Sequence, residues 1–119
     1  MNIKEEIRRM CREKNAVIMA HYYTDGEIQD MADFVGDSLA LAQKAATTNA
    51  DIIVMCGVHF MGETSKILCP DKKVLVPDLE ATCSLAESCP ADKFAEFVAE
   101  HPGHTVISYV NTTAATKAV

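Results

Sequence analysis

The sequence predicts an α/β fold with three layers, in which helices cover both faces of a Rossmann-like parallel sheet. Short runs that are apolar throughout alternate along the chain with segments whose apolar residues have helical spacing. Strands buried on both faces of a parallel sheet have this uniformly apolar composition. The connections between the segments are short, and alternating strands and helices with short connections are typical of a parallel α/β sheet.

The first half of the chain is expected to hold three helices and two strands. Apolar residues share one face of the opening helix, at Ile3, Ile7, Met10 and Cys11. The elements expected after it are a strand over 16–20, a helix over 27–34 ending near Gly36, a helix over 39–47 capped by Asp37 or Ser38, and a strand over 52–55.

The second half is expected to continue the same alternation. A helix over 60–68 is stopped by Pro70, and a strand over 74–76 follows it. Pro90 suits the first turn of a further helix, with Ser88 or Cys89 as its cap. A fourth strand is expected over 105–108, and a last helix opens at Thr112 or Thr113.

Composition excludes several classes of protein. The 119 residues contain 11 Lys and Arg against 17 Asp and Glu, giving a net charge of −6, and 49% of them are hydrophobic. Such a chain can build a core, and its acidity without any Lys/Arg run argues against nucleic-acid binding. No apolar run approaches the roughly 20 residues of a membrane span, and no secretory signal opens the chain. A cytoplasmic protein with no membrane contact is therefore expected.

Polar side chains gather after each predicted strand. These clusters cover residues 21–23, 57–61, 78–84 and 109–113. Ligands of open α/β sheets bind outside the carboxyl ends of the strands, so a parallel sheet would bring the clusters to one crevice. No dinucleotide, P-loop or nucleophile-elbow motif is present, which leaves those binding and hydrolase functions without support.

Each cluster also has a purely structural interpretation. His21, followed by two tyrosines, is either a proton-transfer group or a hydrogen-bonded structural residue. Tyr109 and Asn111 are either groups of the site or residues whose only role is to satisfy the backbone of a turn. Asp37 and Ser38 cap a helix by default, although the same helix start offers N–H donors to a carboxylate or phosphate.

The odd count of five cysteines indicates thiols in a reducing compartment, not a set of disulfides. Cys11 and Cys56 are expected to be packing thiols, and Cys69 has no evident partner. Five residues separate Cys83 from Cys89, a spacing that fits neither zinc sites nor the usual ferredoxins. Spacing alone therefore predicts no metal, whereas the loop position of Cys83 suits a ligand.

Longer stretches of the chain resemble the quinolinate synthase family, the iron–sulfur enzymes of de novo NAD biosynthesis. The stretches are AHYY (20–23), EIQDMADFVGDSL (27–39), CGVHFMGETSKIL (56–68), VPDLEATCSLAESCPADKF (76–94) and HTVISYVNTTAATKA (104–118). The resemblance runs from about residue 3 to Val119 and covers only the first part of the family's three-domain architecture.

The resemblance implies a transferase reaction in which iminoaspartate condenses with dihydroxyacetone phosphate to quinolinate, with loss of phosphate and water. Aspartate oxidase or aspartate dehydrogenase would supply the iminoaspartate. It further implies a pseudo-threefold enzyme whose three similar α/β domains each give one cysteine to a [4Fe–4S] cluster, a Lewis acid with one open iron site. Residues 1–82 would then form the first domain, and residues 83–119 would begin the second.

The resemblance also implies roles for individual residues. It assigns Cys83 as the first cluster ligand and leaves Cys89 without a role. His21, Tyr23 and Tyr109 would take part in catalysis, and the expected substrate-binding residues are His21, Ser38, Tyr109, Val110 and Asn111.

A single thiolate cannot hold a [4Fe–4S] cluster, and the other two cysteine ligands would lie beyond Val119. The chain alone is therefore expected to be catalytically inactive, or to be the N-terminal piece of a longer protein. Two alternatives stay open: a non-catalytic α/β module that binds small acids, and a subunit whose missing cluster ligands come from a separate chain.

Overall fold

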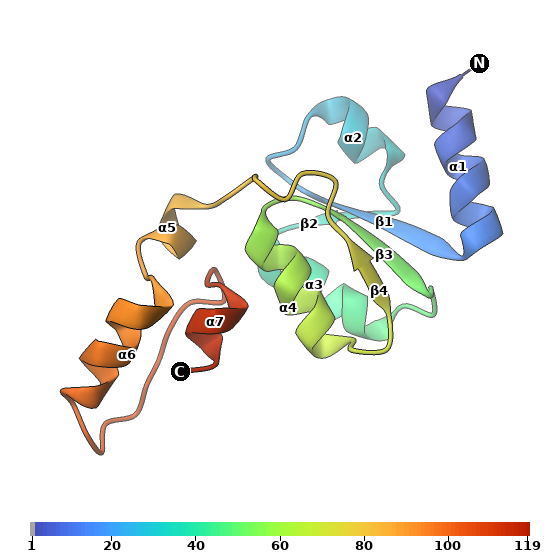
Figure 1. The fold of residues 1–119 in the computed structure, drawn as a ribbon. Coiled ribbons are helices and arrows are strands. Elements are labelled where there is room, and N and C mark those ends of the chain that lie inside the picture. The colour runs from blue at the N-terminus through green and yellow to red at the C-terminus, as the bar shows by residue number, and fades with distance from the viewer. Residues whose placement is uncertain (1) are drawn as a thin grey trace.

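A computed structural model describes residues 2–119 and contains one parallel sheet with helices on both sides (Figure 1). The sheet has the strand order β2-β1-β3-β4, and all three strand pairs are parallel. The predicted α/β class is confirmed. The strands of the sheet and the helices between and before them are, in chain order, α1 (Ile3–Lys14), β1 (Ala16–His21), α2 (Gly26–Met31), β2 (Phe34–Gly36), α3 (Ser38–Thr47), β3 (Ile52–Cys56), α4 (His59–Leu68) and β4 (Lys73–Leu75).

The order of the strands fixes which face each helix covers. The chain steps outward from β1 to β2 through α2, and then in the opposite direction through α3 and α4. Because parallel crossovers are right-handed, α3 and α4 lie together on one face and α2 lies on the other, as Figure 1 shows. All three connections after the strands therefore leave from one edge of the sheet, where the polar clusters were expected.

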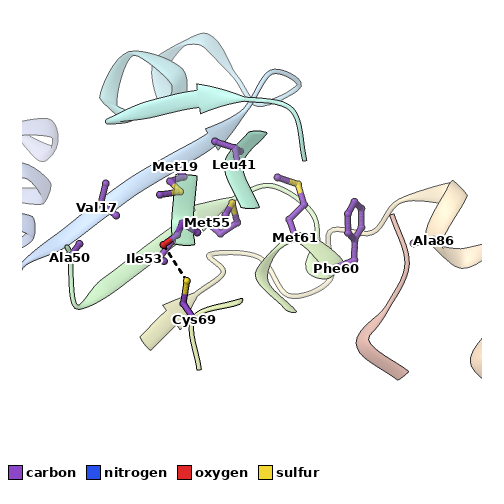
Figure 2. Close-up of a cluster of buried hydrophobic side chains, with 11 residues drawn as sticks. Val17, Met19, Leu41, Ala50, Ile53, Met55, Phe60, Met61, Cys69 and Ala86 are labelled. Carbon is purple, nitrogen blue, oxygen red and sulfur yellow. Dashed lines mark hydrogen bonds between the residues drawn. The ribbon is translucent and has the colours of Figure 1, made fainter. Parts of the chain in front are cut away.

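The core lies between β1, β3 and the helices α3 and α4 (Figure 2). Met19 and Met55 stand on the two central strands and are 0% and 1% exposed. The buried thiol of Cys69 lies 3.1 Å from the carbonyl oxygen of Ala45 and joins the end of α4 to α3. The cluster consists of Val17, Met19, Leu41, Ala45, Ala50, Ile53, Met55, Phe60, Met61, Cys69 and Ala86.

The structure of residues 27–36 differs from the sequence prediction. The helix expected over 27–34 ends at Met31, and 34–36 form the edge strand β2. The cause is Asp33, whose backbone N–H donates to the carbonyl of Ile18 and whose carboxylate accepts from the Ile18 N–H, both at 2.8 Å. These two bonds draw the chain into register beside β1.

The strand predicted over 105–108 is also wrong. This segment is extended but makes no strand, and Ile107 is 88% exposed. A strand requires a neighbour for its N–H and C=O groups, and no strand of residues 2–119 lies beside it. The helices in this part of the chain are α5 (Ser84–Glu87), which the sequence did not predict, α6 (Ala91–Ala99) and α7 (Ala114–Lys117).

The helix starts settle the alternatives for the caps. Asp37 caps α3 by accepting from the Ala40 N–H at 2.7 Å, and Thr113 caps α7. Pro90 itself occupies the cap position of α6, so the expectation that Ser88 or Cys89 caps this helix is wrong. The Ser88 hydroxyl instead donates to the carbonyl of Leu85.

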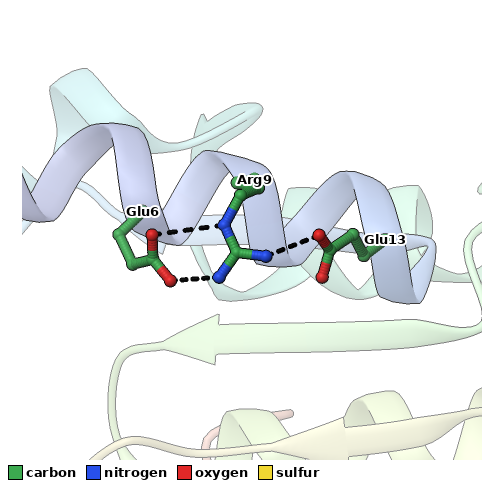
Figure 3. Close-up of polar contacts among 3 residues, drawn as sticks. All are labelled: Glu6, Arg9 and Glu13. Carbon is green, nitrogen blue, oxygen red and sulfur yellow. Dashed lines mark hydrogen bonds and ion pairs between the residues drawn. The ribbon is translucent and has the colours of Figure 1, made fainter.

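The opening helix α1 carries ion pairs within itself, besides one ion pair from Arg8 to Asp33. Arg9 bonds to Glu6 and Glu13 along its solvent side (Figure 3), and these carboxylates raise the pKa of Arg9. None of its side chains is buried, and Ile3 is 71% exposed. Cys11, expected in apolar packing, is only half-buried and lies outside the core cluster.

Candidate functional site

A cavity of about 560 Å³ opens at the carboxyl edge of the sheet. Its wall takes residues from the ends of β1 and β3, the starts of α3 and α4, and the loop 77–84 after β4. The turn at Asn111 closes one side, although it is 27 residues away in sequence from the nearest other lining residue, Ser84. Five residues singled out from the sequence line this cavity, namely His21, Tyr23, Ser38, Cys83 and Asn111.

His21 is the last residue of β1, and its pairing with Gly36 of β2 fixes its backbone. Its Nδ1 accepts a hydrogen bond from the Tyr23 N–H at 3.1 Å, which leaves the proton of a neutral ring on Nε2. Partial burial lowers the pKa of His21 below its ordinary value, and the Asp37 carboxylate opposes this shift. At neutral pH the residue is thus an uncharged donor through Nε2.

The electrostatic coupling between His21 and Asp37 gives a first prediction. Asp37→Asn should lower the pKa of His21 further, because the carboxylate stabilises the imidazolium form. Asn caps helices as well as Asp does, so α3 should stay folded. A proton NMR titration of the His21 ring measures the shift, with Asp25→Asn, at the cap of α2, as the control without effect. A midpoint that rises in Asp37→Asn contradicts the coupling.

Ser38 occupies the first position of α3 and lines the cavity together with His21. Asp37 already caps this helix, so the Ser38 hydroxyl is not used as the cap. The positive end of the helix dipole lies at the same place, and backbone N–H groups there favour an anionic group. The local electrostatics therefore suit a carboxylate, despite the net negative charge of the chain.

The turn at 109–112 contributes unequally to the site. Asn111 lines the main cavity and also a smaller one of about 330 Å³ that shares His21, Tyr23 and Ser38. Val110 lines only the smaller cavity. Tyr109 lines neither and is 70% exposed, so the structure does not bring it together with the other residues.

Tyr23 lies at the rim of the cavity. The residue is 93% exposed, and the centroid of its ring is 4.7 Å from that of the His21 ring. A phenol beside a neutral imidazole is a reasonable pair for moving a proton to or from a bound molecule. The rim position leaves the hydroxyl accessible to a ligand that enters the cavity.

Two thiols line the cavity, although only Cys83 was singled out from its loop. Cys83 precedes α5 and is half-buried. Cys56, expected to be a packing thiol, ends β3 in the cavity wall, and burial raises the pKa of its thiol. Across residues 2–119 no three His, Cys, Asp or Glu side chains gather as a metal site.

Apolar residues that the sequence analysis did not single out form the floor of the cavity. Phe60 and Met61 begin α4 and are each 3% exposed. Gly57 precedes them, and a Cβ atom there would lie 2.7 Å from the Met61 sulfur. Their position after β3 was the available signal, since the strand-end cluster 57–61 contains them.

The length and composition of the helices decide whether any of them can cross a membrane. None of the helices within residues 2–119 is long and apolar enough to cross a bilayer.

Comparison with known proteins agrees with the resemblance in the motifs. The family model described as quinolinate synthetase A protein matches residues 5–119. A quinolinate synthase of Prochlorococcus marinus strain MIT 9313 is 64% identical over 116 residues, which cover 98% of this chain and 35% of the relative.

Two further relatives give the same result. A quinolinate synthase of Cyanothece sp. is 67% identical over 95% of this chain and 35% of its own length. That of Thermosynechococcus vestitus is 60% identical over 100% of this chain and 37% of its own length. The chain thus spans little more than a third of these curated relatives. It belongs to the quinolinate synthase family.

Proposed function

We propose that this chain supplies the part of a quinolinate synthase that binds the iminoaspartate substrate and provides one ligand of the [4Fe–4S] cluster. The complete reaction would condense iminoaspartate with dihydroxyacetone phosphate to quinolinate. The observation that carries the proposal is the single cavity that His21, Ser38, Asn111 and Cys83 line together. These residues come from four separate regions of the chain, and the fold gathers them near the strand ends.

A four-carbon dicarboxylate suits the donors of this cavity. The Ser38 hydroxyl, the start of α3 and the Nε2–H of His21 would bind one carboxylate by hydrogen bonds to a charged acceptor. The Asn111 amide can donate to a second polar group of the same molecule. Phe60 and Met61 would exclude water beneath the carbon chain.

Proton transfers would fall to the residues at the rim. Tyr23 and His21 are the pair that we assign to the dehydration and tautomerisation steps, because each step moves a proton to or from the substrate. The family resemblance supports a catalytic role for Tyr109 and a binding role for Val110 as well. Tyr109 lies outside the cavity, so its participation would require a change in the 109–112 turn.

The quinolinate synthase family uses a [4Fe–4S] cluster, which would supply a Lewis acid when bound. A cluster requires several thiolates. Residues 2–119 bring only Cys83 and Cys56 to the cavity, and the raised pKa of Cys56 disfavours its thiolate form. The residues present therefore do not fit a complete cluster. Cys83 is proposed as one cysteine ligand of the cluster, and the remaining cysteine ligands would come from polypeptide outside this chain.

The proposed assembly follows the domain organisation expected from the sequence. Residues 1–82 would form the first α/β domain, and residues 83–119 would begin the second. A cytoplasmic enzyme fed by aspartate oxidase or aspartate dehydrogenase is the corresponding setting. The incomplete thiol set favours one second candidate, a non-catalytic module that binds small acids in the same cavity.

Binding of succinate, a stable four-carbon dicarboxylate, tests the proposed cavity. Succinate should shift the NMR signals of His21, Ser38 and Asn111 in this chain. Butyrate, which has the same length and one carboxylate, should bind at least about fivefold more weakly, because it leaves one set of donors without a charged acceptor. His21→Phe should weaken succinate binding. Equal affinities for succinate and butyrate would contradict a dicarboxylate site.

A further inference from the structure

Lys117, the last residue of α7, makes three hydrogen bonds to the turn that carries Asn111. Its Nζ donates to the carbonyl oxygen of Val110 at 2.8 Å and to the hydroxyl of Thr112 at 2.9 Å. It also donates to the carbonyl oxygen of Thr112. These bonds use all three donors of the ammonium group, and their acceptors stand on both sides of Asn111.

The turn is ordered around the same acceptors. Thr112 is 3% exposed, and its N–H donates to the carbonyl of Val110 at 2.8 Å. Its hydroxyl donates to the carbonyl of Tyr109 at 3.0 Å while accepting from Lys117. The backbone on either side of Asn111 is therefore held by one buried threonine and one ammonium group, and this backbone sets where the Asn111 side chain stands.

The position of Lys117 is set by the contacts that its helix, α7, makes with α4 and with the chain before α6. Glu63 of α4 accepts from the Ala114 N–H at 3.3 Å, at the start of α7. The Thr116 hydroxyl, buried beside Lys117, donates to the carbonyl of Cys89 at 2.9 Å. The Lys117 Nζ lies 5.9 Å from the ring centroid of Phe60, one of the residues that form the cavity floor. An ammonium at this distance from an aromatic face is attracted to it.

The charge of Lys117 has a nearby counterpart. Partial burial lowers the pKa of Lys117, and the carboxylate of Glu63 acts in the opposite direction. Glu63 thereby favours the ammonium form, which is the form that offers three donors. The group is thus supported both by acceptors and by an opposite charge.

We propose that Lys117 is a positioning residue, which holds the turn 110–112 against α4 and so keeps the Asn111 amide in the wall of the cavity. The consequence for ligand binding rests on the proposed function, in which Asn111 contacts the substrate. The placement of the turn does not depend on that function. Lys117 itself lines neither of the two cavities at the site.

Hydrogen exchange of the chain, followed by NMR, tests the placement of the turn. Lys117→Met keeps the length of the side chain and removes its donors. It should speed exchange of the Thr112 amide by about tenfold. The reason is that the lost hydrogen bonds from a charged donor stabilise the closed turn, and a weaker closed turn opens more often to exchange. Lys93→Met, at an exposed position of α6, is the matched control, and Lys117→Arg should retain most of the protection.

The amide of Ile53, in the central strand β3, separates local positioning from general stability. Its protection should be equal in the chain and in Lys117→Met. An equal loss of protection at Ile53 and Thr112 overturns the proposal in favour of a general structural role. A Thr112 amide that is already unprotected in the unaltered chain, or unaffected by Lys117→Met, also overturns it.

Succinate titration of the same variants connects the turn to the site. Lys117→Met should weaken succinate binding by about fivefold, the expected effect of one misplaced hydrogen-bond donor, and Lys117→Arg should restore it. If the unaltered chain binds no succinate, the proposed function fails while the exchange measurement still decides the role of Lys117. If succinate binds equally to all variants although exchange at Thr112 has changed, the link from Lys117 to the ligand is wrong.

Discussion

Cys83→Ser is expected to abolish the visible absorbance of the iron–sulfur cluster in a chimera that carries this chain in place of the matching segment of the Prochlorococcus marinus relative. The two sequences are 64% identical over 116 residues, so the replacement should fold in that setting. A serine hydroxyl has too high a pKa to replace a thiolate at iron, and a cluster that shares a few thiolates should not survive the loss of one. Anaerobic reconstitution followed by iron and sulfide analysis measures the effect.

The control for this prediction is Cys89→Ser. Cys89 is half-buried, as Cys83 is, and the two cysteines lie on either side of the short helix α5. Cys89 does not line the cavity. Its variant should keep the full iron and sulfide content. Loss of the cluster in both variants indicates damage to the segment 83–89 as a whole, and retention in both shows that the assignment of Cys83 is wrong.

Gly62→Ala is expected to lower the free energy of unfolding by about 2 kcal/mol, the usual cost of forcing an extra methyl group into a packed interior. Gly62 is buried in α4, and a Cβ atom there would lie 2.3 Å from Cγ2 of Val76, just beyond β4. The helix can therefore approach the sheet edge only without a side chain at this position. Urea denaturation of the chain gives the free energy.

Two variants show whether the clash is the cause. Gly26→Ala, where a Cβ atom meets nothing within 4 Å, should change stability little. Combining Gly62→Ala with Val76→Ala should cost less than the two single losses added together, because the methyl group that clashes is gone. If Gly62→Ala unfolds at the same urea concentration as Gly26→Ala, the close packing of α4 is not needed.

Much of the fold follows from patterns within short segments. The apolar runs at β1 and β3 and the spacing in α3 and α4 appear in the sequence because each element buries its own residues. The errors arose where a distant partner decides the structure. Asp33 turns 34–36 into a strand by bonding to Ile18, and residues 105–108 stay unpaired because no described strand lies beside them.

The candidate site divides in the same way. The strand-end rule placed His21 and the 78–84 loop at one crevice, and the cavity contains residues of both. The exposure of Tyr109 was not predictable, because it depends on how the chain after β4 returns to the sheet, whereas Cys56 lines the cavity because it is the last residue of β3. The role of Lys117 was not predictable from the sequence, because Lys117 donates to backbone carbonyls and no sequence motif marks such a residue.

Quinolinate formation by the chimera, beside the chain alone, tests the central claim most directly. The claim is that this chain supplies the substrate cavity and one cluster ligand of a quinolinate synthase. After anaerobic reconstitution, the chimera should form quinolinate from iminoaspartate and dihydroxyacetone phosphate, and the chain alone should form none. A chimera that holds a full cluster but forms no quinolinate, or turnover by the chain alone, would contradict the account.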